Sequence, residues 1–380
     1  MKLCIVVTHL LGTGHLRRAA VLGRAAASAG VDVTILSGGM PVTGLETGNA
    51  RLVQLPPLRS DGVDFSTLLD DTGTPASDAY KTQRSDRLAQ EITAFAPDVL
   101  LTELYPFGRR GLAHEFTTAI QTARGLPRPA AVAASIRDIL APPSKPKRVV
   151  QTEAVLAEYY DAVLVHSDPD VVPLSASWPV SPFLQERLRY TGFVAPAAPS
   201  GESGIAGQGD ILVSAGGGAV GRNLFEKAVQ AARLMPGQKF RLLVGGQDAE
   251  VVRASLIAEA PDNVTVEGLR PDFRNLLACA ACSLSLCGYN TAMDILQTGV
   301  PALFVPFDDG NEVEQTLRAR CLSQLTGIDM MIGAEITAQS LAARLGALCA
   351  TQRRPVSSHQ FDGAMRSIEF LEDLAHARAA

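Results

Sequence analysis

Short apolar runs alternate with longer amphipathic stretches along most of the chain. A strand buried on both faces of a parallel sheet reads as a short continuous apolar run, whereas the helix that follows it repeats its apolar positions every three to four residues or so. The alternation therefore predicts an α/β fold built on parallel sheets.

The first half of the chain fits this pattern from its first residues. We expect strands at 3–8, 32–36, 52–54, 99–102, 130–135 and 162–166, with helices at 14–29, 78–95, 108–124 and 147–160. The interval 60–77 has no clean period and contains Asp, Gly, Thr and Pro, which predicts a long loop.

A change of composition separates the two halves. Residues 196–209, PAAPSGESGIAGQG, have the Pro, Gly and Ser content of a linker. A second series of strands follows, expected at 210–214, 240–244, 264–266, 282–286 and 302–305, and 361–375 reads as an amphipathic helix. We expect two Rossmann-like domains, 1–195 and 210–358, facing across a cleft, with a C-terminal helix in 359–380 that could pack back on the first domain.

Composition limits the partners, the cysteine chemistry and the location to be expected for these domains. The net charge of −5 over 380 residues gives no overall basic character, so we expect no nucleic-acid partner. The cysteines show no disulfide spacing, and buried thiols are favoured over a metal site at Cys279, Cys282 and Cys287. The first apolar run is too short for a signal peptide and no stretch approaches transmembrane length, which predicts a cytoplasmic protein.

The segment from Ser285 to Gln315 is the most informative motif. A strand leads into Gly288 and a helix whose free N–H groups suit an anion such as a phosphate. Asp294 and Glu314 are expected near the starts of two helices, where carboxylates can accept hydrogen bonds from sugar hydroxyls. The motif therefore indicates a nucleotide-sugar site, with an ordinary βαβ unit as the alternative.

Two further loops of the second half suit the same ligand. Three consecutive glycines, Gly216 to Gly218, follow a strand and can cradle a diphosphate with their N–H groups. Arg222-Asn223 follow instead of a Walker lysine, which argues against ATP hydrolysis of that type. The bend at 268–270 could offer backbone groups to a nucleobase edge.

In the first half, Gly12 and Gly14 precede His15 at a helix N-terminus. Arg17 stands where a dinucleotide fingerprint needs its third glycine, so that motif fails. The positive helix end disfavours imidazolium and would keep His15 neutral, available as a base. The alternative is a histidine that caps or packs the turn.

Several polar residues follow the other strands of this half, and together they suggest a polar acceptor pocket. They are Glu103, Arg109, Arg110, Arg137, Asp138 and His166, expected to rim the same cleft. Each alone is more often a cap or a salt bridge. The basic run 142–148 reads as a solvated loop, with contact to an anionic acceptor or a membrane surface as the alternative.

The second half resembles the carboxyl-terminal domain of glycosyltransferase family 28 over roughly 210–350. The likeness lies in SAGGGAVG, in CGYNTAMDILQTGVP, and in ALFVPF followed by Glu314-Gln315. The GTGH turn resembles that family's amino-terminal glycine signature. The whole chain, with ELYPFGRR, SIRDIL and HSDP, is similar to a bacterial group of predicted glycosyltransferases.

This resemblance implies a GT-B fold and an inverting, metal-independent transfer from a UDP-α-sugar. It assigns Gly217 and Gly218 to the diphosphate, the Leu269 backbone to uracil, Asp294 to the ribose, and Glu314 with Gln315 to the donor sugar. Asp294 stands where the family has Glu. The donor-binding candidates are Gly14, Gly216, Gly217, Gly218, Leu269, Arg270, Gly288, Asn290, Thr291, Asp294, Glu314 and Gln315.

The expected reaction needs a base for the acceptor hydroxyl and a site for departing UDP. His15 is the first candidate base, with Glu103 and Asp138 next, and Arg109 and Arg137 are acceptor-binding candidates. We expect no metal and no cofactor beyond the UDP-sugar co-substrate; a solvated loop is favoured over a metal site at Asp308-Asp309. The rivals are a nucleotide-sugar hydrolase or epimerase and a non-catalytic nucleotide-sugar-binding protein. The sequence names neither the sugar nor the hydroxyl acceptor.

Overall fold

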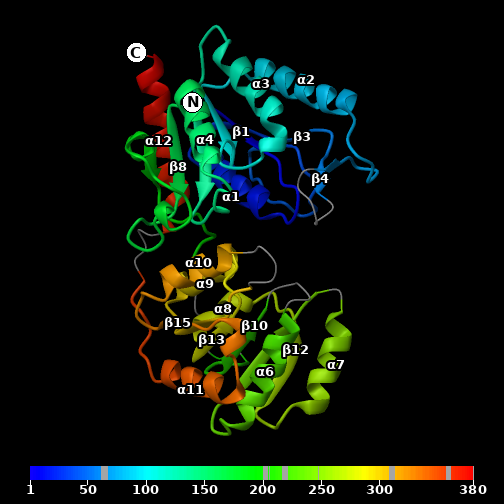
Figure 1. Ribbon diagram of the computed structural model, residues 1–380, viewed down its shortest axis with the longest axis vertical. Helices are drawn as coiled ribbons and strands as arrows, with labels where there is room; N and C mark the ends of the chain where they lie inside the picture. The colour runs from blue at the N-terminus through cyan, green and yellow to red at the C-terminus, as the bar shows by residue number, and fades with distance from the viewer. Residues whose placement is uncertain are drawn as a thin grey trace. The chain divides into compact units, whose positions relative to one another are not determined.

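The computed structural model describes residues 1–60, 67–199, 204, 206–215, 221–246, 248–307, 313–356 and 361–379. The chain divides into two compact units, which we call unit 1 (Met1–Pro196 with His359–Ala380) and unit 2 (Ala197–Ser358) (Figure 1). Each unit is described by itself.

Unit 1 is built on a parallel sheet with the strand order β3-β2-β1-β6-β7-β8-β9. Its strands are β1 (Lys2–Val7), β2 (Asp32–Ser37), β3 (Arg51–Gln54), β6 (Val99–Glu103), β7 (Ala131–Arg137), β8 (Ala162–His166) and β9 (Leu188–Tyr190). The short strands β4 (Arg59–Ser60) and β5 (Leu68–Leu69) pair separately and antiparallel. The strand order reverses between β1 and β6, the place where ligands bind in open parallel sheets.

Helices cover both faces of this sheet. They are α1 (Gly14–Ser28), α2 (Asp78–Phe95), α3 (Ala113–Arg124), α4 (Lys147–Tyr159), α5 (Pro182–Arg187) and α12 (Gly363–Ala379). Alternate residues of β1 enter different cores, because successive strand side chains point to opposite faces. Cys4 and Val6 join the core beneath α2 and α3, whereas Leu3, Ile5 and Val7 join the core beneath α1 and α12.

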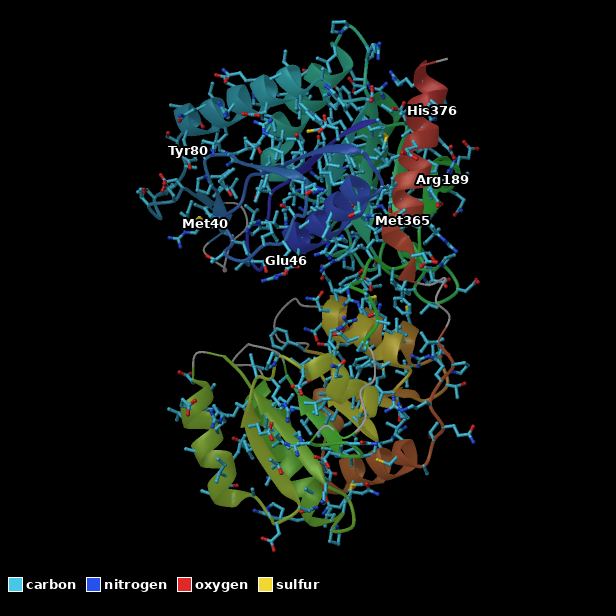
Figure 2. The ribbon with its side chains drawn as sticks, turned by 180° about the vertical axis from the view of Figure 1, so that it is seen from behind. Met40, Glu46, Tyr80, Arg189, Met365 and His376 are labelled. Carbon is cyan, nitrogen blue, oxygen red and sulfur yellow. The ribbon has the colours of Figure 1, made fainter. Side chains whose placement is uncertain are left out.

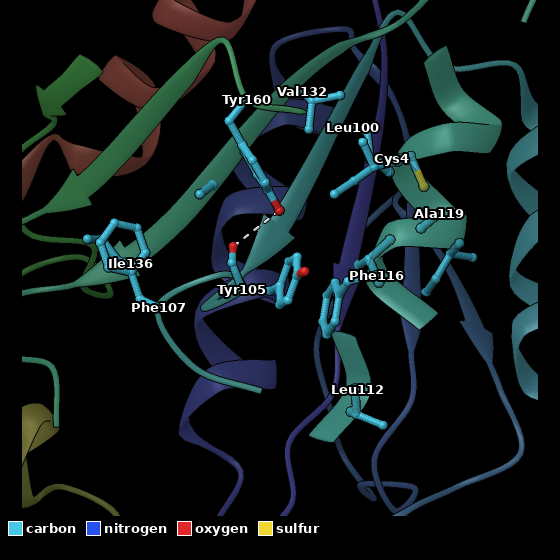
Figure 3. Close-up of a cluster of buried hydrophobic side chains, with 14 of the residues drawn as sticks. Cys4, Leu100, Tyr105, Phe107, Leu112, Phe116, Ala119, Val132, Ile136 and Tyr160 are labelled. Carbon is cyan, nitrogen blue, oxygen red and sulfur yellow. Dashed lines mark hydrogen bonds between the residues drawn. The ribbon is translucent and has the colours of Figure 1, made fainter. Parts of the chain in front are cut away.

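Aromatic side chains fill the core beneath α2 and α3. The rings of Tyr105 and Phe116 stack with their centroids 4.8 Å apart, and the Tyr160 hydroxyl donates to the backbone oxygen of Tyr105 at 3.3 Å (Figure 3). This packing anchors the segment that follows β6, because Tyr105 lies two residues beyond the end of that strand.

The predicted C-terminal helix is α12, and it belongs to unit 1. Ile368 and Leu371 are buried in the same core as α1. The guanidinium carbon of Arg189 lies 5.5 Å from the centroid of the Phe370 ring, beside the same helix (Figure 2). No helix among the described residues is long and apolar enough to cross a membrane.

Unit 2 repeats the topology with the order β12-β11-β10-β13-β14-β15, all parallel. Its strands are β10 (Ile211–Ser214), β11 (Phe240–Val244), β12 (Val264–Gly268), β13 (Cys282–Ser285), β14 (Ala302–Phe304) and β15 (Ile328–Met330). Its helices are α6 (Arg222–Arg233), α7 (Ala249–Glu259), α8 (Phe273–Cys279), α9 (Tyr289–Thr298), α10 (Glu314–Leu322) and α11 (Ala338–Cys349). The order reverses between β10 and β13.

The predicted strands are confirmed within about two residues at each end. The helix predicted from residue 108 is wrong at its start, because α3 begins at Ala113 after a 3₁₀ turn at Arg110–Leu112. Arg109 has a φ value of 59°, which a helix cannot contain. The loop predicted at 60–77 contains β5, and 61–66 lie outside the described residues.

Candidate active site

In unit 1, three adjacent strands each carry a row of apolar side chains on one face, and each row is followed by a polar side chain at the carboxyl end of the strand. On the face beneath α1, these rows consist of Val99 and Leu101 in β6, Ala131 and Ala133 in β7, and Leu164 in β8. The next position on the same face is Glu103, Ser135 and His166, respectively. All three are buried, so a polar cluster continues the core at the carboxyl ends of β6, β7 and β8.

Helix α1 brings two basic side chains to this cluster. His15 and Arg18 lie three residues apart, on the helix face that also buries Ala19 and Leu22. The Nδ1 atom of His15 lies 2.9 Å from Glu103 Oε1, and the Arg18 guanidinium donates to the same oxygen. The side chain of His15 is 16% exposed, whereas that of Glu103 is 2% exposed, so solvent reaches the imidazole and scarcely the carboxylate.

The surroundings fix the charges of this pair. Burial by itself would raise the pKa of Glu103, but the charge of Arg18 and the hydrogen bonds from His15 and Ser135 outweigh it and lower the pKa to about 2. Burial lowers the pKa of His15 to about 4, against the opposing effect of Glu103. At neutral pH the carboxylate is therefore ionised and the imidazole neutral.

The protonated nitrogen of His15 follows from these charges. An ionised carboxylate only accepts hydrogen bonds, so the Nδ1 atom 2.9 Å from it carries the proton. The Arg18 nitrogen 3.4 Å from Nδ1 donates to the carboxylate instead. The lone pair then belongs to Nε2. A neutral imidazole oriented by a carboxylate in this way is suited to take a proton from a hydroxyl group.

The segment after β6 contains a third basic residue, Arg109, whose charge acts on the His15–Glu103 pair. Arg109 Nε donates to the backbone oxygen of Thr8, just past β1, at 2.6 Å. Its charge also acts on His15 and Glu103. The left-handed backbone of Leu104 and Arg109 costs on the order of 1 kcal/mol for each residue, and such backbone strain is concentrated at functional sites.

Other candidates from the sequence lie deeper than expected. The prediction that Glu103, Asp138 and His166 rim a cleft is wrong, since they are 2%, 0% and 0% exposed, respectively. Arg137 is partly buried and its Nε donates to the backbone oxygen of Ile139 at 3.0 Å, within its own loop. The sequence analysis missed Arg18 and Ser135. Arg18 could have been found, because its three-residue spacing from His15 places both side chains on the same face of the predicted helix.

In unit 2, Asp294 does not lie near a helix start, so that prediction is wrong. It is the sixth residue of α9, and Arg274 of α8 donates from Nε to its Oδ1 at 2.7 Å. Burial raises the pKa of Asp294, and Arg274 opposes this. Arg274 also donates to Gln297 Oε1 at 2.5 Å, so the bridge joins α8 to α9.

A buried arginine, which the sequence analysis missed, contacts the backbone of the loop before α9. Gly288 precedes the first residue of the helix, and the side chain of Asn290 in the first turn is exposed, with Thr291 partly exposed after it. Arg318 of α10, 1% exposed, donates to the backbone oxygen of Cys287 at 3.0 Å. This contact fixes the backbone that leads into the helix N-terminus.

The remaining donor candidates lie on neighbouring loops of unit 2. Glu314 begins α10 as expected, and Gln315 Oε1 accepts from the backbone N–H of Phe307 at 3.2 Å. Leu269 follows β12 and is 63% exposed. Arg270 is held by both carboxylate oxygens of Asp272, at 2.8 and 2.6 Å.

Some predictions fall on residues that the structure leaves undescribed. Gly216, Gly217 and Gly218 lie outside the described residues, as do Asp308 and Asp309. Within the described ranges, no group of three or more His, Cys, Asp or Glu side chains is placed to hold a metal ion.

Comparison with solved structures defines the fold class as GT-B. The "Glycotransferase of kitacinnamycin" aligns with a TM-score of 0.66 and 18% identity over 98% of both chains. MurG of Acinetobacter baumannii aligns with a TM-score of 0.63 and 17% identity over 98% of this chain and 100% of the other. At these identities the likeness concerns the fold.

The match to a particular family lies in the second half of the chain. Residues 211–369 match the glycosyltransferase family 28 C-terminal domain. The predicted resemblance is thereby confirmed: residues 211–369 resemble the family 28 C-terminal domain, in a chain with a GT-B fold.

Two curated relatives match over less than half of the chain. The UDP-N-acetylglucosamine--N-acetylmuramyl-(pentapeptide) pyrophosphoryl-undecaprenol N-acetylglucosamine transferase of Rhodospirillum centenum is 33% identical over 37% of this chain and 38% of its own length. The enzyme of the same name from Paramagnetospirillum magneticum is 29% identical over 44% and 48%. The chain thus spans less than half the length of these two relatives.

Proposed function

We propose that the protein is an inverting glycosyltransferase that moves a sugar from a UDP-sugar to a hydroxyl group of an acceptor. The observation that carries this proposal is the His15–Glu103 pair at the strand-order reversal of unit 1, in a chain whose second half is a family 28 domain. The relatives' names support a UDP-sugar as the donor.

In this proposal His15 Nε2 takes the proton of the acceptor hydroxyl while the hydroxyl oxygen attacks the anomeric carbon. The bond from that carbon to the UDP oxygen breaks, and its electron pair leaves on the diphosphate. Glu103 stabilises the imidazolium that forms, because its carboxylate bonds to Nδ1–H. A single displacement inverts the configuration at the anomeric carbon.

Unit 2 contributes the donor site. The N–H groups at the start of α9 suit the diphosphate charge, which needs no metal in this proposal. Asp294 binds the ribose, Glu314 and Gln315 the donor sugar, and Arg109 and Arg137 of unit 1 the acceptor. A cytoplasmic location, contact with a membrane surface and independence from cofactors stay predictions.

The test is UDP release from a set of UDP-sugars, measured with and without hydroxyl acceptors. Release that requires an acceptor, with a glycosylated product by mass spectrometry, is the expected result. Release into water alone would instead identify a hydrolase, and conversion of one UDP-sugar into another an epimerase. Binding of a UDP-sugar without any turnover would identify a binding protein and overturn the proposal.

A further inference from the structure

The polar cluster of unit 1 extends past Glu103 as a continuous row of hydrogen bonds. Ser135 Oγ lies 2.8 Å from Glu103 Oε2 and 2.8 Å from His166 Nε2. On the far side of the ring, His166 Nδ1 lies 2.9 Å from Thr191 Oγ1. Glu103, Ser135 and His166 belong to β6, β7 and β8, and Thr191 directly follows β9, so the row crosses neighbouring strand ends.

The charge of Glu103 decides where each proton in this row lies. An ionised carboxylate accepts, so Ser135 gives its single hydroxyl proton to Oε2. Ser135 Oγ must then accept from His166, whose Nε2 therefore carries a proton. Burial lowers the pKa of His166 to about 3, so the ring is neutral and its lone pair belongs to Nδ1, 2.9 Å from Thr191 Oγ1. The Thr191 hydroxyl also lies 3.0 Å from the backbone oxygen of Gly192, an alternative acceptor for its proton. The protons of Ser135 and His166 thus point toward Glu103.

The buried charge of Glu103 does not need this row of hydrogen bonds for its compensation. Arg18 is buried against Oε1 and already supplies a compensating charge. Ser135 and His166 are 0% exposed and continue two rows that are otherwise apolar. Polar groups at such positions cost stability unless they bond to one another. The row instead fixes the orientation of the Glu103 carboxylate, because the hydrogen bond to Oε2 leaves Oε1 facing His15.

We propose that Ser135 and His166 are positioning residues for His15. They hold the Glu103 carboxylate so that Oε1 stays on His15 Nδ1, which keeps the imidazole in the tautomer with its lone pair on Nε2. The role in transfer rests on the proposed function of His15, but the tautomer is a property of the resting protein and can be measured without any substrate.

The first test is ¹⁵N NMR of the imidazole nitrogens, with His15 and His166 identified by single substitutions. We expect His15 to be protonated on Nδ1 and His166 on Nε2 in the unsubstituted protein at pH 7. Ser135→Ala should give a mixture of His15 tautomers, whereas Ser135→Thr, which keeps the hydroxyl, should preserve the Nδ1–H form. An unchanged His15 tautomer in folded Ser135→Ala would overturn the proposal.

Matched substitutions separate this role from general loss of packing. Ser37 ends β2 in the same sheet and is equally buried, and its hydroxyl has no partner among the described residues, so Ser37→Ala should leave His15 unchanged. At the other end of the row, His166→Gln keeps an amide donor and should preserve the tautomer, whereas His166→Leu should not. If Ser135→Ala fails to fold by circular dichroism, Ser135→Cys, with a weaker donor, replaces it.

The second test is the rate of UDP release. Ser135→Ala should lower kcat on the order of 10-fold at unchanged KM for the donor, because the base loses its orientation, and Ser135→Thr should restore most of it. Equal kcat in Ser135→Ala and the unsubstituted protein would overturn the positioning role. If the unsubstituted protein itself releases no UDP, the proposed function fails, and the NMR result still decides whether the row sets the tautomer.

Discussion

The two sheets reverse their strand order at equivalent places but carry different chemistry there. In unit 1, the ends of β1 and β6 gather titratable side chains, with His15, Arg18 and Glu103 in direct contact. In unit 2, β10 and β13 end in Ser214 and Ser285, and the helix after β13 presents backbone N–H groups behind Gly288. The same topology therefore places titratable side chains at the reversal in unit 1 and a helix N-terminus at the reversal in unit 2.

The charged residues of unit 2 sharpen this contrast. Asp294 of α9 pairs with Arg274 of α8, and Arg270 pairs with Asp272 two residues further along its own loop. In unit 2 these charged side chains pair with one another, whereas in unit 1 a neutral imidazole contacts an ionised carboxylate. Substitutions in unit 1 should change the rate of turnover, and substitutions in unit 2 the affinity for the donor.

The largest effect should come from His15→Ala. Removing a general base costs ~10²–10⁴-fold in rate, so kcat should fall by that margin while UDP affinity stays unchanged and circular dichroism shows a folded protein. UDP release and titration calorimetry measure the two quantities. The control is His114→Ala on the exposed side of α3, which should be neutral. Near-normal turnover in His15→Ala would return the imidazole to a structural role.

The next effect concerns the stability of unit 1. Glu103 has a pKa of about 2 in the folded chain against its usual 4.5, a difference that corresponds to about 3 kcal/mol of unfolding free energy. A lowered carboxyl pKa stabilises the fold above pH 4.5, and this contribution is lost as the pH falls from 4.5 through 2.

Glu103→Gln should therefore lower the unfolding free energy by about 3 kcal/mol at pH 7, and the deficit should shrink below pH 4.5. Urea unfolding at pH 7 and pH 3.5 measures this change. Glu46→Gln serves as control, since the Glu46 side chain is 84% exposed. A deficit that does not depend on pH would show that Glu103 contributes by packing and not by charge.

Ligand stabilisation tests the donor side of the comparison. UDP at ~100 times its dissociation constant should raise the unfolding free energy by roughly 2.7 kcal/mol. NAD and ATP should give no such shift, because the dinucleotide fingerprint and the Walker lysine are missing. Thermal shift with each nucleotide at matched concentration measures the difference. Equal stabilisation by ATP, or none by UDP, would contradict a uridine-nucleotide site.

A comparable or smaller effect is expected from Asp294→Ala. If the carboxylate accepts ribose hydroxyls, its loss should weaken donor binding by about 1.5–3 kcal/mol and leave kcat at saturating donor unchanged. Arg274→Ala is the matched control, because it breaks the same bridge but keeps the carboxylate. Equal loss of affinity in both variants would show that the bridge, and not the ribose contact, holds the donor site together.

Some of this organisation could be predicted from the sequence, because buried parallel strands read as apolar runs. Strand β8 and helix α2 were predicted with the bounds that the structure shows. The edge strand β15, Ile328–Met330, was missed, since Asp329 at its centre interrupts the apolar run. The predicted helix start at residue 108 was wrong because Arg109 has a positive φ, which the sequence around it does not reveal.

The site was predicted only in part for a similar reason. His15 was recognisable because the glycine turn and the helix start are local in sequence. Its contact with Glu103 joins residues 88 positions apart, and Ser135 became part of the row through the register of β6 with β7, where it lies opposite Glu103. The Arg274–Asp294 bridge likewise depends on how α8 packs against α9. No single stretch of sequence contains these pairings.

The pH dependence of kcat/KM for UDP release tests the central claim most directly, that neutral His15 is the proton acceptor. The charged groups that face His15 are Glu103, Arg18 and Arg109, and burial lowers its pKa to about 4. The rate should therefore stay level from neutral pH downward and fall as the pH drops through about 4, with circular dichroism confirming the fold at each pH. The residual rate of His15→Ala should lack this fall. The same acid fall in His15→Ala, or a level rate down to pH 3 in the folded protein, would contradict the account.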